Sequence, residues 1–268
     1  LNPVEISAKR INLGEISNKI SKDNLENIFS KNGFALIRKG VFFAQDIYAD
    51  GLKKGDINVV IDGERYHSAC PNRMDSPLTR INPLELESVD LSKNTFNVQA
   101  GLGGLVSFNR SSPSLSPLFK AELSALAGSQ SGIDFAASGD YSNHRISLRY
   151  AQGSPFVDGE DNTFKESYNY KDNYDFKLAE GSLRGRYGKL LYGASFSYTD
   201  NVSFPYLLMD ERVNRVYSAH LRYEKHKIYF NYTDHMMDNN LRISPTLMRT
   251  EVTNLTIGAI GDFYEVVY

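Results

Sequence analysis

Sulfur-bearing side chains are scarce in this sequence, and several of them lie in two short segments. The chain has one cysteine and five methionines among 268 residues. Cys70 and Met74 lie four residues apart, and Met237 follows His235 by two positions. Thiolate, thioether and imidazole groups are ligands that a soft ion such as copper(I) accepts. The two segments therefore predict a site for a soft metal ion.

The spacing of the first segment suits one turn of a helix. Proline is favoured at the first position of a helix, so Pro71 could open such a turn. The side chains of Cys70 and Met74 would then project from the same side. The alternative is that Cys70 is a small buried apolar residue, which is the usual role of a lone cysteine.

The second segment belongs to a predicted strand in which apolar and polar residues alternate. The apolar face of this strand carries the side chains at positions 228, 230 and 232. A period of two places the odd-numbered His235 and Met237 on the opposite face and leaves Met236 on the apolar one. The pattern therefore selects the His-x-Met pair. The alternative is that the histidine lies in a loop and the methionines only fill space.

The composition excludes several classes of protein. The net charge is −2, from 30 basic and 32 acidic residues, and gives no argument for a nucleic-acid partner. The mean hydropathy is −0.39 and no run approaches 18 apolar residues, which excludes a membrane-spanning helix. A transmembrane β-barrel stays possible because its strands alternate lipid-facing and lumen-facing residues. The first residues lack a basic segment followed by an apolar one, so an exported chain would be in its mature form.

The residue pattern changes near position 111. Before it, residues 23–29 predict a short amphipathic helix, and residues 34–37 and 57–61 predict buried strands. Residues 111–117 are rich in serine and proline and predict a linker. After the linker, apolar and polar residues alternate in about nine segments of about ten residues, the length of a tilted strand that crosses a bilayer.

The expected links between these strands alternate in length. Short links are expected at 141–144, 188–189, 225–227 and 258–261, and longer ones at 153–176, 200–214 and 238–247. Outer-membrane barrels have short periplasmic turns and long outer loops. A soluble antiparallel sandwich remains the alternative, although it has no reason to alternate its link lengths.

Three segments resemble parts of TonB-dependent outer-membrane receptors. Residues 56–63 (DINVVIDG) resemble a plug segment that ends in an Asp-Gly turn, and residues 99–108 (QAGLGGLVSF) resemble the glycine-rich segment that closes such plugs. Residues 3–10 resemble the N-terminal stretch in which the TonB box lies or has just ended. The resemblance implies an α+β plug domain in residues 1–110. It also implies the N-terminal part of an antiparallel transmembrane β-barrel in residues 111–268, with about nine of roughly 22 strands.

A narrower resemblance concerns metal binding. Residues 70–77 (CPNRMDSP) and 234–239 (DHMMDN) resemble the two metal-binding segments of the copper receptor subfamily (OprC/NosA-like), and residues 204–211 resemble one of its outer loops. That subfamily pairs Cys-x-x-x-Met in the plug with His-x-Met in the barrel. Carried over residue by residue, the resemblance implies four ligands: Cys70, Met74, His235 and Met237. Copper(I) is the favoured cargo and copper(II) the second choice. His67 could be an additional or transient ligand, but the spacing does not require it, and we expect that it is not one.

We therefore expect a receptor in the outer membrane of a Gram-negative bacterium that binds and imports copper, with TonB as its partner at the N-terminal segment. The alternatives are a receptor for a siderophore, haem or another metal chelate, and a non-transporting β-barrel or β-sandwich used for binding or adhesion. We expect no enzyme, because no nucleophile elbow is present and no motif pairs the acidic residues. Because eight or nine strands enclose only side chains, a plug of about 110 residues implies a wider barrel and a longer or split receptor.

Overall fold

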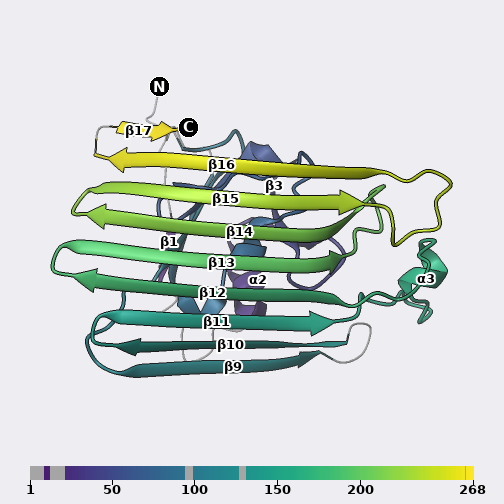
Figure 1. Cartoon of the computed structure of the whole chain (residues 1–268), viewed down its shortest axis with the longest axis horizontal. Helices are drawn as coiled ribbons and strands as arrows, with labels where there is room; N and C mark the ends of the chain where they lie inside the picture. The colour runs from purple at the N-terminus through teal and green to yellow at the C-terminus, as the bar shows by residue number, and fades with distance from the viewer. Residues whose placement is uncertain (1–8, 13–21, 94–98, 127–130, 263) are drawn as a thin grey trace.

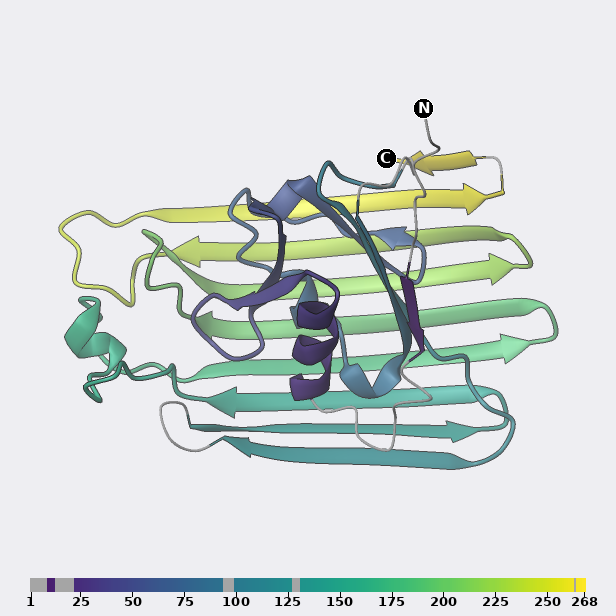
Figure 2. The same ribbon diagram turned by 180° about the vertical axis from the view of Figure 1, so that it is seen from behind.

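The molecule consists of two parts packed face to face. The computed structural model describes residues 9–12, 22–93, 99–126, 131–262 and 264–268. The N-terminal part, up to residue 110, is a small α+β unit that we call the plug. The rest is a sheet of nine antiparallel strands that we call the wall (Figure 1). Seen from behind, the plug lies against one face of the wall (Figure 2). This arrangement confirms the expected fold class; most of the expected TonB box, at residues 3–8, lies outside the described residues.

The described residues of the plug form a helix and two small sheets. The sheets have the strand orders β1-β7-β8-β5-β6 and β2-β3-β4. The elements of the plug are β1 (Lys9–Asn12), α2 (Lys22–Lys31), β2 (Ala35–Arg38), β3 (Gln45–Ala49), β4 (Leu52–Lys53), η1 (Lys54–Asp56), β5 (Ile57–Ile61), β6 (Glu64–Arg65), η2 (Pro77–Arg80), η3 (Pro83–Glu85), β7 (Leu86–Ser92) and β8 (Gly104–Arg110).

The helix and strands expected in the plug are present, but the strand expected to be buried at 34–37 is β2, in which only Leu36 is buried. Leu25, Ile28 and Phe29 of α2 are buried in the main core of the plug. Gly33 follows the helix with φ 76°, a left-handed conformation that suits a helix end. β5 has the expected bounds and ends in the Asp-Gly turn, where Asp62 also has a positive φ of 52°.

The wall is a meander in which each strand pairs with its neighbour in the sequence. Its elements, with the small helix of one outer connection, are β9 (Leu118–Leu126), β10 (Gly132–Tyr141), β11 (His144–Gly153), α3 (Phe164–Ser167), β12 (Phe176–Tyr187), β13 (Leu190–Val202), β14 (Asp210–Tyr223), β15 (His226–Asp238), β16 (Arg249–Gly261) and β17 (Tyr264–Val267). β8 ends at Arg110 and β9 begins at Leu118. The division of the chain at residue 110 into two domains stays a prediction.

Short and long connections alternate along the wall, and one expected turn is wrong. The longer connections are residues 154–175, 203–209 and 239–248. The expected turn at 258–261 is instead part of β16, which continues to Gly261. The glycine at 258 leaves room for a neighbouring side chain, because a Cβ there would meet the ring of Tyr229 on β15. This glycine therefore marks close packing within a strand and not a turn.

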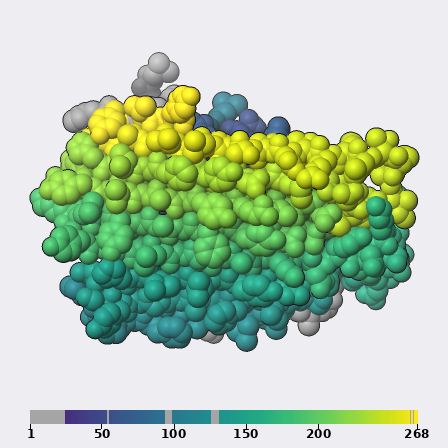
Figure 3. Space-filling model, in the orientation of Figure 1, coloured from purple at the N-terminus to yellow at the C-terminus, as the bar shows by residue number. Residues whose placement is uncertain are grey.

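The two faces of the wall differ sharply in polarity. On β11, Ile146 and Leu148 face away from the plug and are 58% and 53% exposed, whereas Arg145 and Arg149 face the plug and are at most 5% exposed. A soluble sheet would bury its apolar face instead. The face turned away from the plug is the one seen in Figure 3. Among the described residues, no helix has the length and apolar character needed to cross a membrane.

Candidate functional site

Cys70 and Met74 lie in the plug segment between β6 and η2. The helical turn expected to begin at Pro71 is wrong. The segment forms a tight turn in which the amide of Arg73 donates to the carbonyl oxygen of Cys70 at 2.8 Å. Arg73 has φ 52°, and a left-handed residue cannot continue a right-handed helix. Both Cys70 and Met74 are nevertheless buried, at 4% and 2% exposure.

Buried charged groups hold this turn in place. The carboxylate of Asp75 accepts hydrogen bonds from the hydroxyl of Ser68 at 2.5 Å and from the amide of Ala69 at 2.9 Å, which joins the two ends of the segment. Lys39 Nζ donates to the carbonyl oxygen of Arg73 at 2.9 Å. These contacts fix the backbone around Cys70 without helical hydrogen bonds.

His235 and Met237 lie near the end of β15, beside the longer connections. Both side chains face the plug, at 0% and 3% exposure. Met236 between them is less buried and belongs to the other face of the strand. The faces predicted from the period of two are thus confirmed.

The structure brings the two sulfur-bearing segments together. Cys70, Met74 and Met237 belong to one buried apolar cluster, and Met209 packs at its edge. We call this the sulfur cluster. Its other buried members are Val41, Phe42, Phe43, Ala44, Ala151, Phe176, Leu178, Val202 and Phe204. Four of the six sulfur-bearing residues in the sequence therefore belong to, or pack against, one apolar cluster between plug and wall.

His235 has an acidic neighbour that the sequence did not predict. Its Nδ1 atom lies 3.3 Å from Oε2 of Glu211, and both side chains are 0% exposed. Glu211 falls within the segment 204–211 that resembled an outer loop, but no pattern there indicated its contact with β15. Within the described ranges, no three His, Cys, Asp or Glu side chains gather closely enough to hold a metal ion. A metal at this position would therefore depend on methionine sulfur.

His67 belongs to the same plug segment as Cys70 but is not part of the sulfur cluster. It lines a cavity of about 460 Å³ together with Cys70, Arg65 and Asn254. Cys70 thus borders both this cavity and the sulfur cluster. The expectation that His67 is not a ligand stays a prediction.

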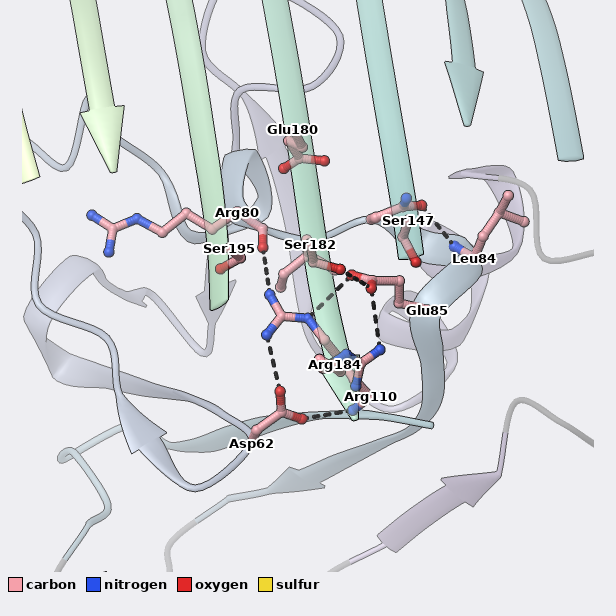
Figure 4. A network of polar contacts seen from close by, with 12 residues as sticks. Asp62, Arg80, Leu84, Glu85, Arg110, Ser147, Glu180, Ser182, Arg184 and Ser195 are labelled. Atoms are coloured by element: carbon pink, nitrogen blue, oxygen red, sulfur yellow. Dashed lines mark hydrogen bonds and ion pairs between the residues drawn. The ribbon is translucent and has the colours of Figure 1, made fainter. Parts of the chain in front are cut away.

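A network of ion pairs attaches the plug to the wall (Figure 4). On β12 it lies further along the strand than the residues that belong to the sulfur cluster. Glu85 of η3 accepts hydrogen bonds from the hydroxyl of Ser182 at 2.5 Å and from Arg184 Nη2 at 3.1 Å. Within the plug, Arg110 of β8 donates from Nη1 to the carboxylate of Asp62 at 2.9 Å, and Lys227 of the wall donates from Nζ to the carbonyl oxygen of Asp62 at 2.7 Å. The interface away from the sulfur cluster is therefore polar and closely paired.

The arginines of this network keep the plug carboxylates ionised. Burial alone would raise the pKa of Glu85, but the guanidinium groups of Arg110 and Arg184 hold that pKa below its usual value. The pKa of Asp62 is also lowered, because Arg110, Arg184 and Lys227 outweigh the effect of burial. The attachment of the plug to the wall therefore depends on charged carboxylates.

Comparison with known proteins identifies the fold. No protein-family model matches the chain, and no curated protein matches it significantly. Solved structures do match. The chain is 22% identical to the copper transporter OprC, covering 97% of this chain and 44% of that one, with a TM-score of 0.68. The chain is 10% identical to the siderophore receptor PirA from Acinetobacter baumannii, covering 94% of this chain and 44% of that one, with a TM-score of 0.61.

A third match is the ferric citrate transporter FecA in its unliganded form. The identity is 12%, the match covers 94% of this chain and 43% of that one, and the TM-score is 0.60. The chain spans less than half the length of each of these structures. At this level of identity the likeness concerns the fold. The chain has the fold of the TonB-dependent outer-membrane receptors, comprising a plug and part of a barrel wall.

Proposed function

We propose that this protein is an outer-membrane receptor of a Gram-negative bacterium that binds copper and imports it with energy supplied through TonB. The outward apolar face of the wall supports a location in lipid, because a bilayer solvates such a face and water does not. The matched structures are receptors and transporters, which favours transport over adhesion or catalysis.

The proposed copper ligands are Cys70, Met74, His235 and Met237. The observation that carries this proposal is that three of these four residues share one buried cluster, although they come from segments far apart in the sequence. Thiolate and thioether groups favour copper(I), and copper(II) is the second candidate. The likeness to the copper transporter OprC is consistent with this cargo.

A receptor for a siderophore, haem or another metal chelate is the second candidate, because the fold matches the siderophore receptor PirA nearly as well. The sulfur cluster argues against a chelate at that position. Cys70, Met74 and Met237 are each at most 4% exposed. A bare ion can bind among such side chains, whereas a chelate would need the plug and wall to part first.

The division of the ligands between two parts of the protein suggests how the ion is released. Cys70 and Met74 belong to the plug, and His235 and Met237 belong to the wall. TonB would pull on the N-terminal segment and displace the plug. Each part would then keep only two of the four ligands, so affinity would fall and the ion would pass to the periplasm.

Copper binding by single-residue variants tests this function. The full chain in detergent is loaded with copper(I) under reducing conditions, and the bound metal and its affinity are measured against a competing chelator. We expect Cys70→Ala, Met74→Ala and Met237→Ala each to lose at least about tenfold in affinity, since even residues that only support metal ligands contribute that much. Met236→Ala is the matched control, because Met236 neighbours the site but belongs to the other face of β15. Unchanged copper stoichiometry and affinity in Cys70→Ala and Met74→Ala would overturn the proposal.

A further inference from the structure

Glu211 lies beside the proposed ligand His235, where a carboxylate could orient the ring of a metal-binding histidine. One carboxylate oxygen, Oε1, accepts a hydrogen bond from the hydroxyl of Thr199. The other, Oε2, lies 3.3 Å from Nδ1 of His235. In the described part of the chain, neither Oε2 nor either ring nitrogen of His235 has a hydrogen-bond partner. Two fully buried polar side chains thus meet with unused hydrogen-bonding capacity.

An irregularity in β14 is what directs Glu211 inward. In the regular part of β14 the inward side chains have even numbers, such as Asn214 and Val216, which are at most 5% exposed. Glu211 would face outward if this alternation continued. A β-bulge between Glu211 and Val213 adds one residue and reverses the alternation, so that Glu211 pairs with Met237 and faces the plug. Bulges that redirect a side chain are typical of functional positions in sheets.

No fixed cation lies beside the carboxyl group of Glu211. Among the described residues, no lysine or arginine lies within 4.0 Å of its carboxylate. Arg80, on the facing turn of the plug, pairs with Asp75 instead, at 3.3 Å. A buried carboxylate is costly unless a cation or hydrogen bonds compensate it. A metal ion held by His235 would supply that compensation.

We propose that Glu211 is the positioning residue of the copper site. It would accept the Nδ1–H of His235, fix the ring orientation and tautomer, and leave Nε2 for the ion. Metal-binding histidines commonly donate their second N–H to a carboxylate, which also makes the ring a better ligand. This inference rests on the proposed function, since it gives Glu211 its role through a bound copper ion.

The test compares Glu211→Gln and Glu211→Leu with wild type in the full chain. We expect both variants to bind one equivalent of copper(I) with an affinity about 10–100-fold weaker. The matched control is Glu180→Gln, which alters another buried glutamate of the wall that pairs with Arg149 and not with the site. Its copper affinity is expected to equal that of wild type.

A second readout separates positioning from a merely structural role. The nitrogen chemical shifts of ¹⁵N-labelled histidine report the tautomer of His235 in the metal-free protein, recorded at a pH at which Glu211 is ionised, with His235→Asn used for assignment. We expect Nδ1–H in wild type and a loss of this preference in Glu211→Leu. Wild-type copper affinity together with an unchanged tautomer in Glu211→Leu would overturn the inference and leave the proposed function intact. Absence of copper binding by the wild-type chain would overturn both.

Discussion

Replacing Arg242 by alanine should loosen the three longer connections of the wall. The guanidinium group of Arg242 lies in the 239–248 connection and bonds both carboxylate oxygens of Asp210, at 2.7 and 2.8 Å. It also donates to the carbonyl oxygens of Phe204 and Leu207, at 2.7 and 2.6 Å, and to the hydroxyl of Tyr170 at 3.0 Å. One side chain therefore joins all three longer connections.

The size of the effect follows from burial. The Asp210 side chain is 0% exposed and that of Arg242 is 12% exposed. Removing one partner of a buried ion pair costs about 3–5 kcal/mol. Asp210 would keep hydrogen bonds from the Tyr170 hydroxyl and the Phe204 amide, at 2.6 and 2.8 Å. We therefore expect a cost near the lower limit, about 3 kcal/mol, which is roughly a 100-fold change in the opening equilibrium of the connections.

Hydrogen–deuterium exchange of the 203–209 peptide measures this opening directly. Arg249→Ala is the control, because Arg249 pairs with Glu251 on the surface, where both side chains are more than half exposed. Such an exposed, solvent-screened pair contributes little, so exchange should stay close to that of wild type. Equal exchange in Arg242→Ala and Arg249→Ala would show that the buried pair does not hold the connections closed.

Two further predictions concern the contact between plug and wall. Gly40→Ala should weaken copper binding and destabilise the protein by about 1–3 kcal/mol, measured by thermal melting, because a Cβ at Gly40 would collide with the carbonyl oxygen of Ser203; an unchanged melting temperature would contradict this close approach. Acid should also weaken the contact. Burial raises the pKa of Glu85, but the charges of Arg110 and Arg184 together outweigh burial, so the pKa lies below its ordinary value. This stabilisation is present above about pH 4.3, the value for an unfolded chain, and is lost as the pH falls through the lower folded value. The melting temperature of Glu85→Gln should therefore fall less than that of wild type over this range, and parallel acid profiles would refute the prediction.

The alternation of residues predicted the wall and the orientation of half of the candidate site. Strands such as β10, β11 and β15 have one face against the plug and one away from it, so burial repeats about every second residue. On β15 this repeat is enough to place His235 and Met237 on the face turned toward the plug. The helix around Leu25 and Phe29 was predictable for a similar reason, since one face packs on the core.

The unpredicted features depend on contacts between distant segments. The turn at Cys70 departs from a helix because Asp75 and Lys39 hold its backbone, and Lys39 is remote in the sequence. The bulge that turns Glu211 inward is set by pairing with β15, and nothing in the local residue pattern marks it. The nearness of Met209 to the sulfur cluster likewise follows from how the 203–209 connection folds back.

The polar character of the surface between plug and wall has a consequence for how the two parts can separate. Wall side chains that face the plug, such as Arg145, Ser147 and Arg149, are well solvated by water when exposed. Parting there uncovers little apolar area, so water molecules can replace the contacts one at a time. The sulfur cluster is the exception, because its aromatic and aliphatic members gain nothing from hydration. We therefore expect the plug to hydrate and loosen first along its ion pairs, with the cluster as the last dry point of attachment.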